Sequence, residues 1–331
     1  MKKGYPWIDK ARIVAAICVI AIHISPLEHI SPFADLFLTR ILGRLAVPFF
    51  FIVTAYFLFQ NGYPSLEKIK KTFVHLMKWY IIAIMIYIPL MIYNHYFSQK
   101  DLFINVVKDL FIDGTFYHLW YFPAVMIGLI IVLFLKTHFT SSWCLFISCC
   151  LYGLGLCGDA YYGLAIEIPF IKGILDWLFL WMDYTRNGFF FAPVFLMIGI
   201  LISEQKQTFL LQINIILCLL SFVLMSIEAC LLHHFSICQH DSMYILLPLT
   251  SYFLFNLLIR QKGSRSLVLK DVSLDMYIFH PLMIVVVRML GKLIHLKAVL
   301  DNHLIQFMLV TVLTIVFSIV LERVKQYANN I

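Results

Sequence analysis

An arginine and a histidine share one face of the first apolar segment of the chain. Arg12 and His23 are separated by ten residues, and eleven steps of about 100° bring a helix back to within roughly 20° of the same face. The two side chains therefore point into one groove, about 16 Å apart along the helix axis. Charged and titratable groups are costly in a membrane helix, so they usually face a cavity, a partner or a substrate path. The alternative is that Arg12 reaches the cytoplasmic surface and His23 is a hydrogen-bonded packing residue.

A second polar cluster lies in a later apolar segment. Ser273, Tyr277 and His280 are spaced four and three residues apart and share one helix face. Pro281 follows His280 and frees a backbone carbonyl in the helix. His280 lies about 12 Å from the start of its helix, close to the middle of the membrane. Because a neutral histidine can act as general base toward a hydroxyl or an amine, we predict a polar cavity lined by the first and ninth spans.

Further polar residues are predicted to lie around the outer mouth of this cavity. They are Arg44, His118, Trp120, Tyr121, Arg186 and Asn187. The arginines could hold a phosphate or a carboxylate through paired hydrogen bonds. Each prediction has an alternative. Arg44 can anchor at lipid headgroups, Trp120 and Tyr121 can belong to an interfacial aromatic belt, and Asn187 can cap a helix.

The composition excludes a soluble globular protein. Of 331 residues, 62% are hydrophobic and 13% are charged, and the mean hydropathy is +0.90. We predict an all-α, polytopic bundle in the lipid bilayer, formed by a single domain over residues 1–331. Its ten predicted spans are 8–30, 41–60, 72–93, 119–136, 142–157, 188–203, 208–232, 242–260, 272–291 and 303–321. Segment 160–187, with its tyrosines and tryptophans, is predicted to be interfacial or re-entrant. The first span lacks a cleavage pattern and is expected to remain as an anchor.

The distribution of basic residues predicts that both termini are cytoplasmic. With ten spans, 16 of the 25 Lys and Arg residues fall on the side of the N-terminus, including Lys206, Lys262 and Arg265. Twelve of the 18 acidic residues fall on the other side. The net charge of +7 then follows from topology and needs no nucleic-acid partner. No Cys or His spacing resembles a zinc site, and no metal is expected.

Taken together, these motifs resemble those of the acyltransferase-3 family of integral membrane proteins. The matching features are Arg12 and His23, Arg44 with Pro48-Phe49-Phe50, His118-Leu119-Trp120, and Ser273, Tyr277 and His280-Pro281. The resemblance implies a ten-helix protein of the bacterial cytoplasmic membrane that moves acyl groups from a coenzyme A donor onto extracytoplasmic acceptors. It also implies that His23 is the catalytic histidine and that Arg12 positions the donor or the histidine. One position departs, since many members have Ser-Gly where this chain has Thr54-Ala55, which puts close helix packing there in doubt.

Within that family, the chain is similar to the membrane half of membrane-bound serine racemases of vancomycin-resistance operons. The likeness rests on residues 46–51, 117–124 and 186–193. In that subgroup the membrane half is associated with the supply of L-serine to a cytoplasmic pyridoxal-phosphate racemase domain. The present sequence contains no such domain, so we expect a stand-alone relative or a truncated chain, with a separate serine racemase as a conceivable partner.

Two functions remain open at this level. In the first, an acyl-CoA, most simply acetyl-CoA, enters from the cytoplasm and contacts Arg12, Ser273, Tyr277 and His280, and His23 deprotonates a small-molecule or glycan acceptor. In the second, the same cavity carries L-serine, bound by the histidines and arginines near the midplane. The sequence does not separate them, because an enzyme and a carrier both need a polar cavity with a buried histidine.

Overall fold

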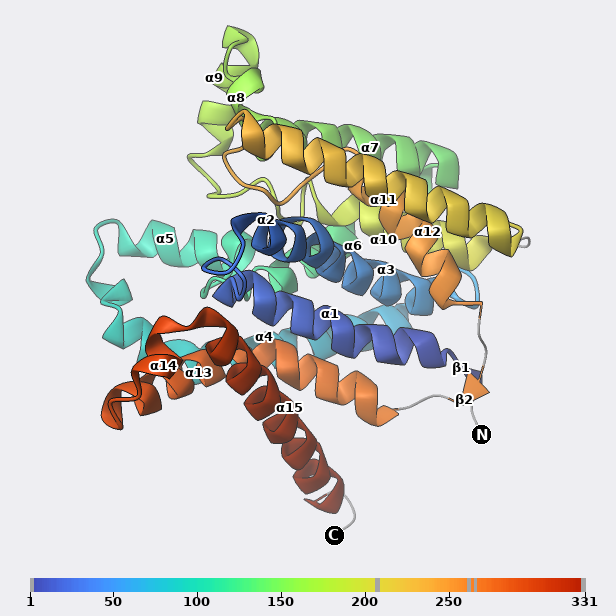
Figure 1. The fold of residues 1–331 in the computed structure, drawn as a ribbon. Coiled ribbons are helices and arrows are strands. Elements are labelled where there is room, and N and C mark those ends of the chain that lie inside the picture. The colour runs from blue at the N-terminus through green and yellow to red at the C-terminus, as the bar shows by residue number, and fades with distance from the viewer. Residues whose placement is uncertain (1–2, 206–208, 261–262, 265–266, 329–331) are drawn as a thin grey trace. The chain divides into compact units, whose positions relative to one another are not determined.

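The computed structural model describes residues 3–205, 209–260, 263–264 and 267–328, and its regular structure is almost entirely helical (Figure 1). A two-residue antiparallel ladder pairs β1 (Lys3–Gly4) with β2 (Gly263–Ser264). Four of the basic residues used to predict orientation lie outside the described residues, namely Lys2, Lys206, Lys262 and Arg265.

Each predicted span coincides with a helix or with a continuous run of helical turns. In chain order these are α1 (Pro6–Ile24), the run α2 (Pro32–Asp35), η1 (Leu36–Leu42), η2 (Gly43–Leu45) and α3 (Ala46–Phe59), then α4 (Leu66–Tyr93), α6 (Tyr121–His138), α7 (Ser141–Cys157), α10 (Ala192–Glu204), α11 (Leu211–His234), α12 (Leu247–Leu258), α13 (Leu267–Leu293) and α15 (His303–Ala328). Among the described residues, six of these stretches are long and apolar enough to cross a membrane. The chain is therefore a multi-pass helical membrane protein. The count of ten spans and the cytoplasmic position of the termini stay predictions.

The first helix is shorter than the predicted span of 8–30. It ends at Ile24 because Ser25 adopts a left-handed backbone conformation (φ 52°) and donates its N–H to the carbonyl of Ala21, and because Pro26 cannot continue the helix. Asp9, Lys10 and Arg12 occupy the first turns of α1. These three charges distinguish α1 from the six stretches, each of which contains an apolar window with at most two charged residues.

Segment 160–187 contains two short helices, α8 (Tyr162–Ala165) and α9 (Pro169–Leu178), and no helix of spanning length. Trp177 and Trp181 expose more than half of their surface. This arrangement fits the predicted interfacial position. The remaining short elements are η3 (Tyr96–Ser98), α5 (Leu102–Lys108), η4 (Asp109–Asp113) and α14 (Lys297–Asp301).

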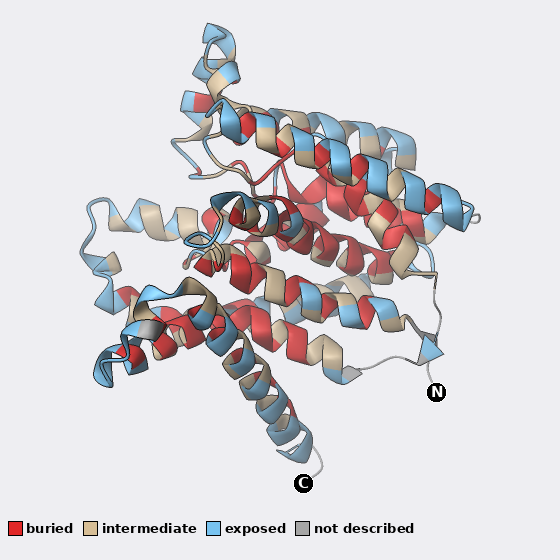
Figure 2. Cartoon of the chain, in the orientation of Figure 1, coloured by how far each residue is buried: buried red, intermediate tan, exposed pale blue. Residues whose placement is uncertain are grey.

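Two of the long helices expose apolar side chains over most of their surface (Figure 2). Only 22% of the most apolar window is buried in α11 and in α15, against 67% in α13. Exposing so many Ile, Leu and Val side chains to water would be unfavourable, whereas lipid chains are as apolar as these side chains. The exposed faces of α11 and α15 therefore face the bilayer.

The described chain forms two compact units. The first consists of Met1–Val47 with Phe253–Ile331, and the second consists of Pro48–Tyr252. The first unit contains the Arg12, His23 and His280 motifs, and the second contains the His118 and Arg186 motifs.

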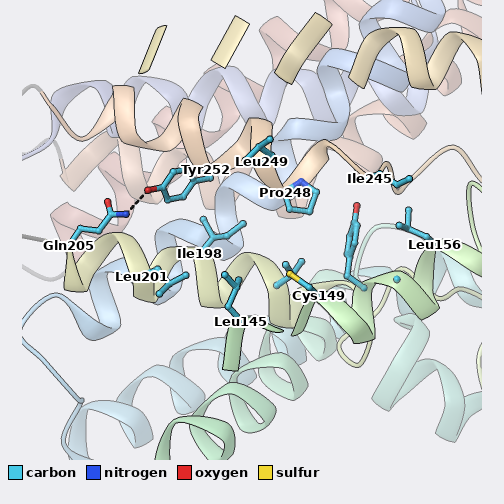
Figure 3. Close-up of a pocket in the computed structure, with 13 residues that line it drawn as sticks. Leu145, Cys149, Leu156, Ile198, Leu201, Gln205, Ile245, Pro248, Leu249 and Tyr252 are labelled. Atoms are coloured by element: carbon cyan, nitrogen blue, oxygen red, sulfur yellow. Dashed lines mark hydrogen bonds between the residues drawn. The ribbon is translucent and has the colours of Figure 1, made fainter. Parts of the chain in front are cut away.

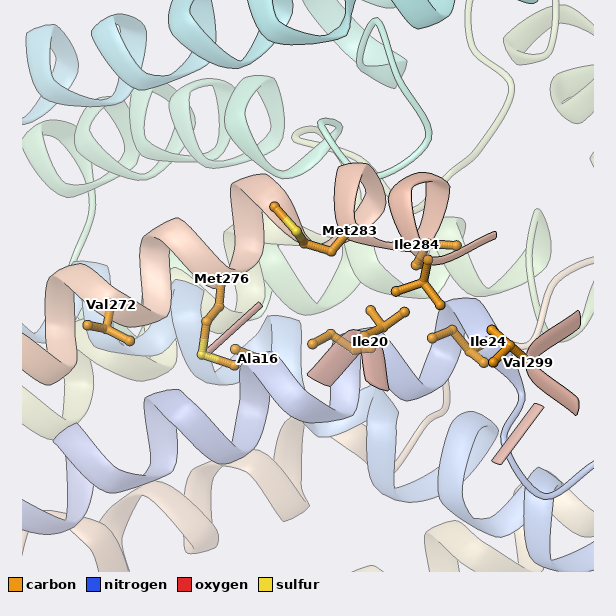
Figure 4. Packing of buried hydrophobic residues seen from close by; sticks show 10 residues of the cluster. Ala16, Ile20, Ile24, Val272, Met276, Met283, Ile284 and Val299 are labelled. Carbon is orange, nitrogen blue, oxygen red and sulfur yellow. The ribbon is translucent and has the colours of Figure 1, made fainter. Parts of the chain in front are cut away.

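The core of the first unit forms between α1 and α13 (Figure 4). Ala16, Ile20 and Ile24, spaced four residues apart, present one stripe of α1. This stripe packs against α13, whose contributing residues are Val272, Met276, Met283, Ile284 and Val287. The interface fixes the rotation of α1 about its axis and therefore the direction of every polar side chain on it.

In the second unit, α3 and α10 approach each other closely despite the missing Ser-Gly pair. Ala55 is fully buried. The glycine that permits the contact comes from the other helix, because a Cβ on Gly199 would lie 2.4 Å from the carbonyl oxygen of Ile52 and 3.0 Å from the Cβ of Ala55. The departure at Thr54-Ala55 thus leaves the close packing intact.

The α1–α13 core predicts a large cost for truncating Ile20, which is fully buried. Ile20→Ala removes packing atoms and leaves a cavity, so we expect a loss of about 2–4 kcal/mol in the free energy of unfolding. Denaturant or thermal unfolding in detergent measures this loss. Val14→Ala on the same helix is the control, because Val14 exposes 60% of its surface and should change stability little. Equal effects of the two substitutions would contradict the packing described here.

Candidate functional site

The predicted site residues fall into two groups, one in each compact unit. In the first unit, the imidazole rings of His23 on α1 and His280 on α13 stack with centroids 5.3 Å apart and an angle of 22° between their planes. His280 is fully buried, and His23 is half-buried. Two histidines separated by more than 250 residues in the chain thus form one pair.

Pro281 determines how His280 is held. A proline has no N–H, so it cannot make the helical hydrogen bond to the carbonyl four residues earlier, which is that of Tyr277. The Nδ1 atom of His280 lies 2.8 Å from this carbonyl oxygen and 3.2 Å from that of Met276. Both partners are acceptors, so Nδ1 carries the proton in the neutral ring. Nε2 then keeps a lone pair, as a base or a hydrogen-bond acceptor requires.

The remaining predicted residues of this unit are also buried. Ser273 and Tyr277 expose 2% and 7% of their surface, and the Tyr277 ring lies 6.2 Å from that of His280, so all three lie on the buried side of α13. The hydroxyl of Ser273 donates to the carbonyl of Lys270. Arg44 is buried in the short turn η2, which packs beside α1.

Arg12 forms the predicted ion pair at the start of α1. Its Nε atom lies 4.0 Å from Oδ1 of Asp9, and both residues are buried. Arg12 also continues the α1 stripe of Ala16 and Ile20, and His23 follows three residues after Ile20. Arg12 and His23 therefore lie along the side of α1 that packs against α13, as the spacing predicts.

The sequence reasoning missed a buried charge cluster beside these residues. Asp275 on α13 has no exposed surface, and both of its oxygens accept from Nζ of Lys325 on α15, at 2.9 and 3.0 Å. Nζ also donates to Glu322 at 2.7 Å. A buried carboxylate without such a partner would be strongly destabilising. Asp275 was visible in the sequence, but its partner lies 50 residues away and no local pattern indicated it.

In the second unit, Arg186 lies against aromatic rings. Its guanidinium carbon is 4.6 Å from the ring centroid of Trp120 and 5.2 Å from that of Tyr184. Cation–π contacts of this kind hold a planar guanidinium in one orientation. Nη1 of Arg186 donates to the hydroxyl of Ser242 at 3.1 Å. The structure therefore brings together Trp120 and Arg186, two of the predicted site residues, with Tyr184 and Ser242. Their place at the mouth of a cavity stays a prediction.

A buried aspartate positions Ser242. Oδ1 of Asp159 accepts from the backbone N–H groups of Ser242 and Met243, at 2.8 and 2.9 Å, and Asp159 has no exposed surface. The carboxylate therefore fixes the loop that carries the Ser242 hydroxyl. No local sequence pattern indicates this role, because Asp159 lies 83 residues before Ser242.

Asn187 makes hydrogen bonds of the capping kind, which was the structural alternative for this residue. Its Oδ1 accepts from the N–H groups of Phe189 and Phe190, and its Nδ2 donates to the carbonyl of Tyr184. The amide thus closes the turn that leads into α10. Gly188 is required beside it, because a Cβ there would lie 2.6 Å from the Cβ of Ile127.

His118 and Tyr121 lie in aromatic surroundings. His118 exposes 1% of its surface, and its ring contacts those of Tyr87, Phe116 and Tyr117. The Tyr121 ring lies 5.0 Å from that of Phe51, and its hydroxyl lies 3.5 Å from that of Thr54. In the described structure, the His118 ring is thus held among aromatic side chains, two residues before Trp120, and its role as a substrate contact stays a prediction.

The second unit also contains an apolar cavity of about 590 Å³ that no predicted residue lines (Figure 3). Its walls come from α7, α10 and the residues around the start of α12, and include Leu145, Ile198 and Leu249. A hydrogen bond from the amide of Gln205 to the hydroxyl of Tyr252 lies at one end.

Comparison with known sequences adds the family context. Residues 5–323 match the sequence profile of a family described as "Acyltransferase domain", Acyl_transf_3. The chain is 38% identical to an amino-acid racemase of Enterococcus faecalis, an alignment that covers 98% of this chain and 47% of the relative. It is 35% identical to a serine/alanine racemase of Enterococcus gallinarum, over 96% of this chain and 46% of the relative. The chain thus spans about half the length of these relatives. No solved structure matches it significantly.

The role of Pro281 can be tested by replacing it. Pro281→Ala restores an N–H that competes for the Tyr277 carbonyl, so we expect His280 to populate a mixture of tautomers. Nitrogen-15 shifts of labelled histidine in the detergent-solubilised protein report this directly. Pro89→Ala is the control, because Pro89 also lies inside a helix, α4, but the residue directly before it is Ile88. A single unchanged His280 tautomer in Pro281→Ala would contradict the role assigned to the proline.

Proposed function

The chain belongs to the acyltransferase-3 family, and from this premise we propose that it transfers an acyl group, most simply acetyl, from cytoplasmic acyl-CoA to a hydroxyl or amino acceptor. The observation that carries the proposal is the stacked pair of His23 and His280. A transferase of this kind needs one group that takes a proton from the acceptor and returns it to the leaving thiolate.

His23 is the proposed base. It removes the proton of the acceptor as the acceptor oxygen or nitrogen attacks the thioester carbonyl. The carbon–sulfur bond then breaks, and the proton on His23 passes to the sulfur to give free coenzyme A. His280 holds the ring of His23 by stacking, while its own ring is held by the Tyr277 carbonyl. A positioned base of this kind contributes roughly 10²–10⁴-fold to the rate.

A cavity in the same unit supports binding of a long donor arm. It has a volume of about 350 Å³ and is lined mostly by α13 and α15, with Val272, Met276 and Ile315 among its apolar residues. Glu322, Arg323 and Gln326 supply the polar groups of its lining, and Glu322 is paired with Lys325. Met276 lies one helical turn before His280 and provides one of its carbonyl contacts. An acyl-pantetheine arm in this cavity would thus approach the histidine pair, with the phosphates of the donor near Arg323.

L-serine transport is the second candidate, and the Arg186 cluster favours it. A guanidinium oriented by Trp120 and Tyr184 suits a carboxylate. The relatives are named as amino-acid and serine/alanine racemases, so a supply of small amino acids is a chemically related task.

Radiolabelled acetyl-CoA tests the enzyme proposal without knowledge of the acceptor. We expect micromolar binding to the purified protein, weakened about tenfold in Arg12→Ala, and transfer of label to membrane or cell-wall fractions. In His23→Ala, transfer should fall at least 100-fold, which is within the range of general-base catalysis, with folding retained. His138→Ala, an exposed histidine at the end of α6, should transfer normally. Full transfer by His23→Ala would remove His23 from the mechanism.

Proteoliposomes loaded with buffer and supplied with labelled L-serine test the carrier. Serine uptake that is lost in Arg186→Gln and retained in His23→Ala would support transport through the second unit. The absence of uptake by folded wild-type protein that binds acetyl-CoA would leave acyl transfer as the function.

A further inference from the structure

Three aspartates of the second unit bring their carboxylates together although the sequence separates them. One oxygen from each of Asp109, Asp113 and Asp183 lies within 4.8 Å of the other two. Asp109 and Asp113 begin and end η4, and Asp183 follows α9 in the segment that leads to Arg186. None of the three belongs to the two groups of site residues described above.

The buried member of the cluster has an unsatisfied oxygen. Asp113 exposes 8% of its surface. Its Oδ2 accepts from the backbone N–H of Asp183 at 2.8 Å, whereas Oδ1 is buried and has no hydrogen-bond partner among the described residues. A buried carboxylate oxygen without a partner is costly unless a ligand satisfies it. Burial accordingly raises the pKa of Asp113, to about 7.

The groups around the cluster leave it short of positive charge. Lys108 donates to Oδ1 of Asp183 at 2.6 Å, and the Tyr96 hydroxyl donates to Oδ2 of Asp109 at 2.6 Å. One ammonium therefore faces three carboxylates. A divalent cation would neutralise the remaining charge. The second oxygen of Asp183 stays accessible to it, because the Asp183 side chain is exposed.

We propose that Asp109, Asp113 and Asp183 bind a hard divalent cation, with Ca²⁺ as the ion that matches their chemistry. Ca²⁺ takes carboxylate oxygens in a flexible geometry, whereas Mg²⁺ demands a near-ideal octahedron and usually keeps several waters beside one or two carboxylates. One oxygen from each of the three aspartates lies within 4.8 Å of the other two, which is close enough for all three to reach one ion. Water would complete the coordination, because three carboxylates supply fewer ligands than the six to eight that Ca²⁺ takes.

The bound ion would join two separate segments. η4 leads through Gly114 to Trp120, and Asp183 leads to Tyr184 and Arg186. Gly114 has a φ of +83°, and a Cβ on it would lie 2.3 Å from the backbone nitrogen of Trp120, so the turn after Asp113 is tightly fixed to the start of α6. The ion would therefore stabilise the two segments that bring Trp120 and Arg186 into contact. Sequence reasoning predicted no metal, because the aspartates form no local motif.

Terbium luminescence provides the test, since Tb³⁺ replaces Ca²⁺ and is excited through a nearby tryptophan such as Trp181, two residues before Asp183. We expect saturable emission from the chelator-treated, purified protein, displaced by Ca²⁺ at concentrations of about 0.1–1 mM. Ca²⁺ should also raise the unfolding temperature. Asp113→Asn should weaken both effects at least tenfold. Asp176→Asn should leave them unchanged, because Asp176 is exposed and pairs with Lys172 on α9.

Three results would overturn the proposal. They are the absence of saturable emission and of thermal stabilisation in folded wild type, displacement by Mg²⁺ or Zn²⁺ but not by Ca²⁺, and equal emission from Asp113→Asn. If Asp113→Asn fails to fold, Asp109→Asn at the half-buried end of the cluster replaces it, with the same tenfold loss expected. The readout is metal binding alone, so its outcome is independent of acyl transfer and of serine uptake.

Discussion

The hydrogen bond between His280 and the carbonyl of Tyr277 is the interaction on which the first unit depends. It exists because Pro281 leaves that carbonyl without its usual helical donor, and it places Nδ1 of His280 2.8 Å from the freed oxygen. A membrane helix must satisfy its backbone groups internally. Here a side chain meets that requirement and is itself held in one tautomer. The missing backbone hydrogen bond of the helix and the fixed orientation of the His280 ring thus have the same cause. The ring of His23 stacks on this fixed ring.

In the second unit, the group that is held in a fixed orientation is the permanently charged guanidinium of Arg186. Arg186 keeps its proton at physiological pH. Its guanidinium contacts the faces of Trp120 and Tyr184 and the hydroxyl of Ser242. These contacts fix the plane of the guanidinium, and a guanidinium with a fixed plane can bind a carboxylate or a phosphate through paired hydrogen bonds.

The sequence predicted features that repeat within one helix and missed those that join distant segments. Hydrophobic periodicity located the helices, and spacings of three, four and eleven residues placed Arg12, His23 and His280 on buried faces. The pairing of Asp275 with Lys325 and the use of Asp159 to hold Ser242 join residues 50 and 83 positions apart. No local rule of spacing contains such contacts, because they depend on which helices pack together. The first span was predicted too long because the left-handed backbone conformation of Ser25 ends the helix. Hydropathy carries no information about backbone conformation.

The names of the relatives do not decide between enzyme and carrier. Those racemases are about twice as long as the region that this chain matches, so a name for the whole protein assigns no activity to the matched half. The chemistry of the matched region itself has to distinguish the two functions. A carrier needs reversible contacts to a zwitterion, and a fixed guanidinium can supply the contact to its carboxylate. An acyltransferase additionally needs a group that accepts and returns a proton during one turnover. A stacked histidine pair with one ring fixed by a proline-freed carbonyl offers that group, and binding of an amino acid does not require it.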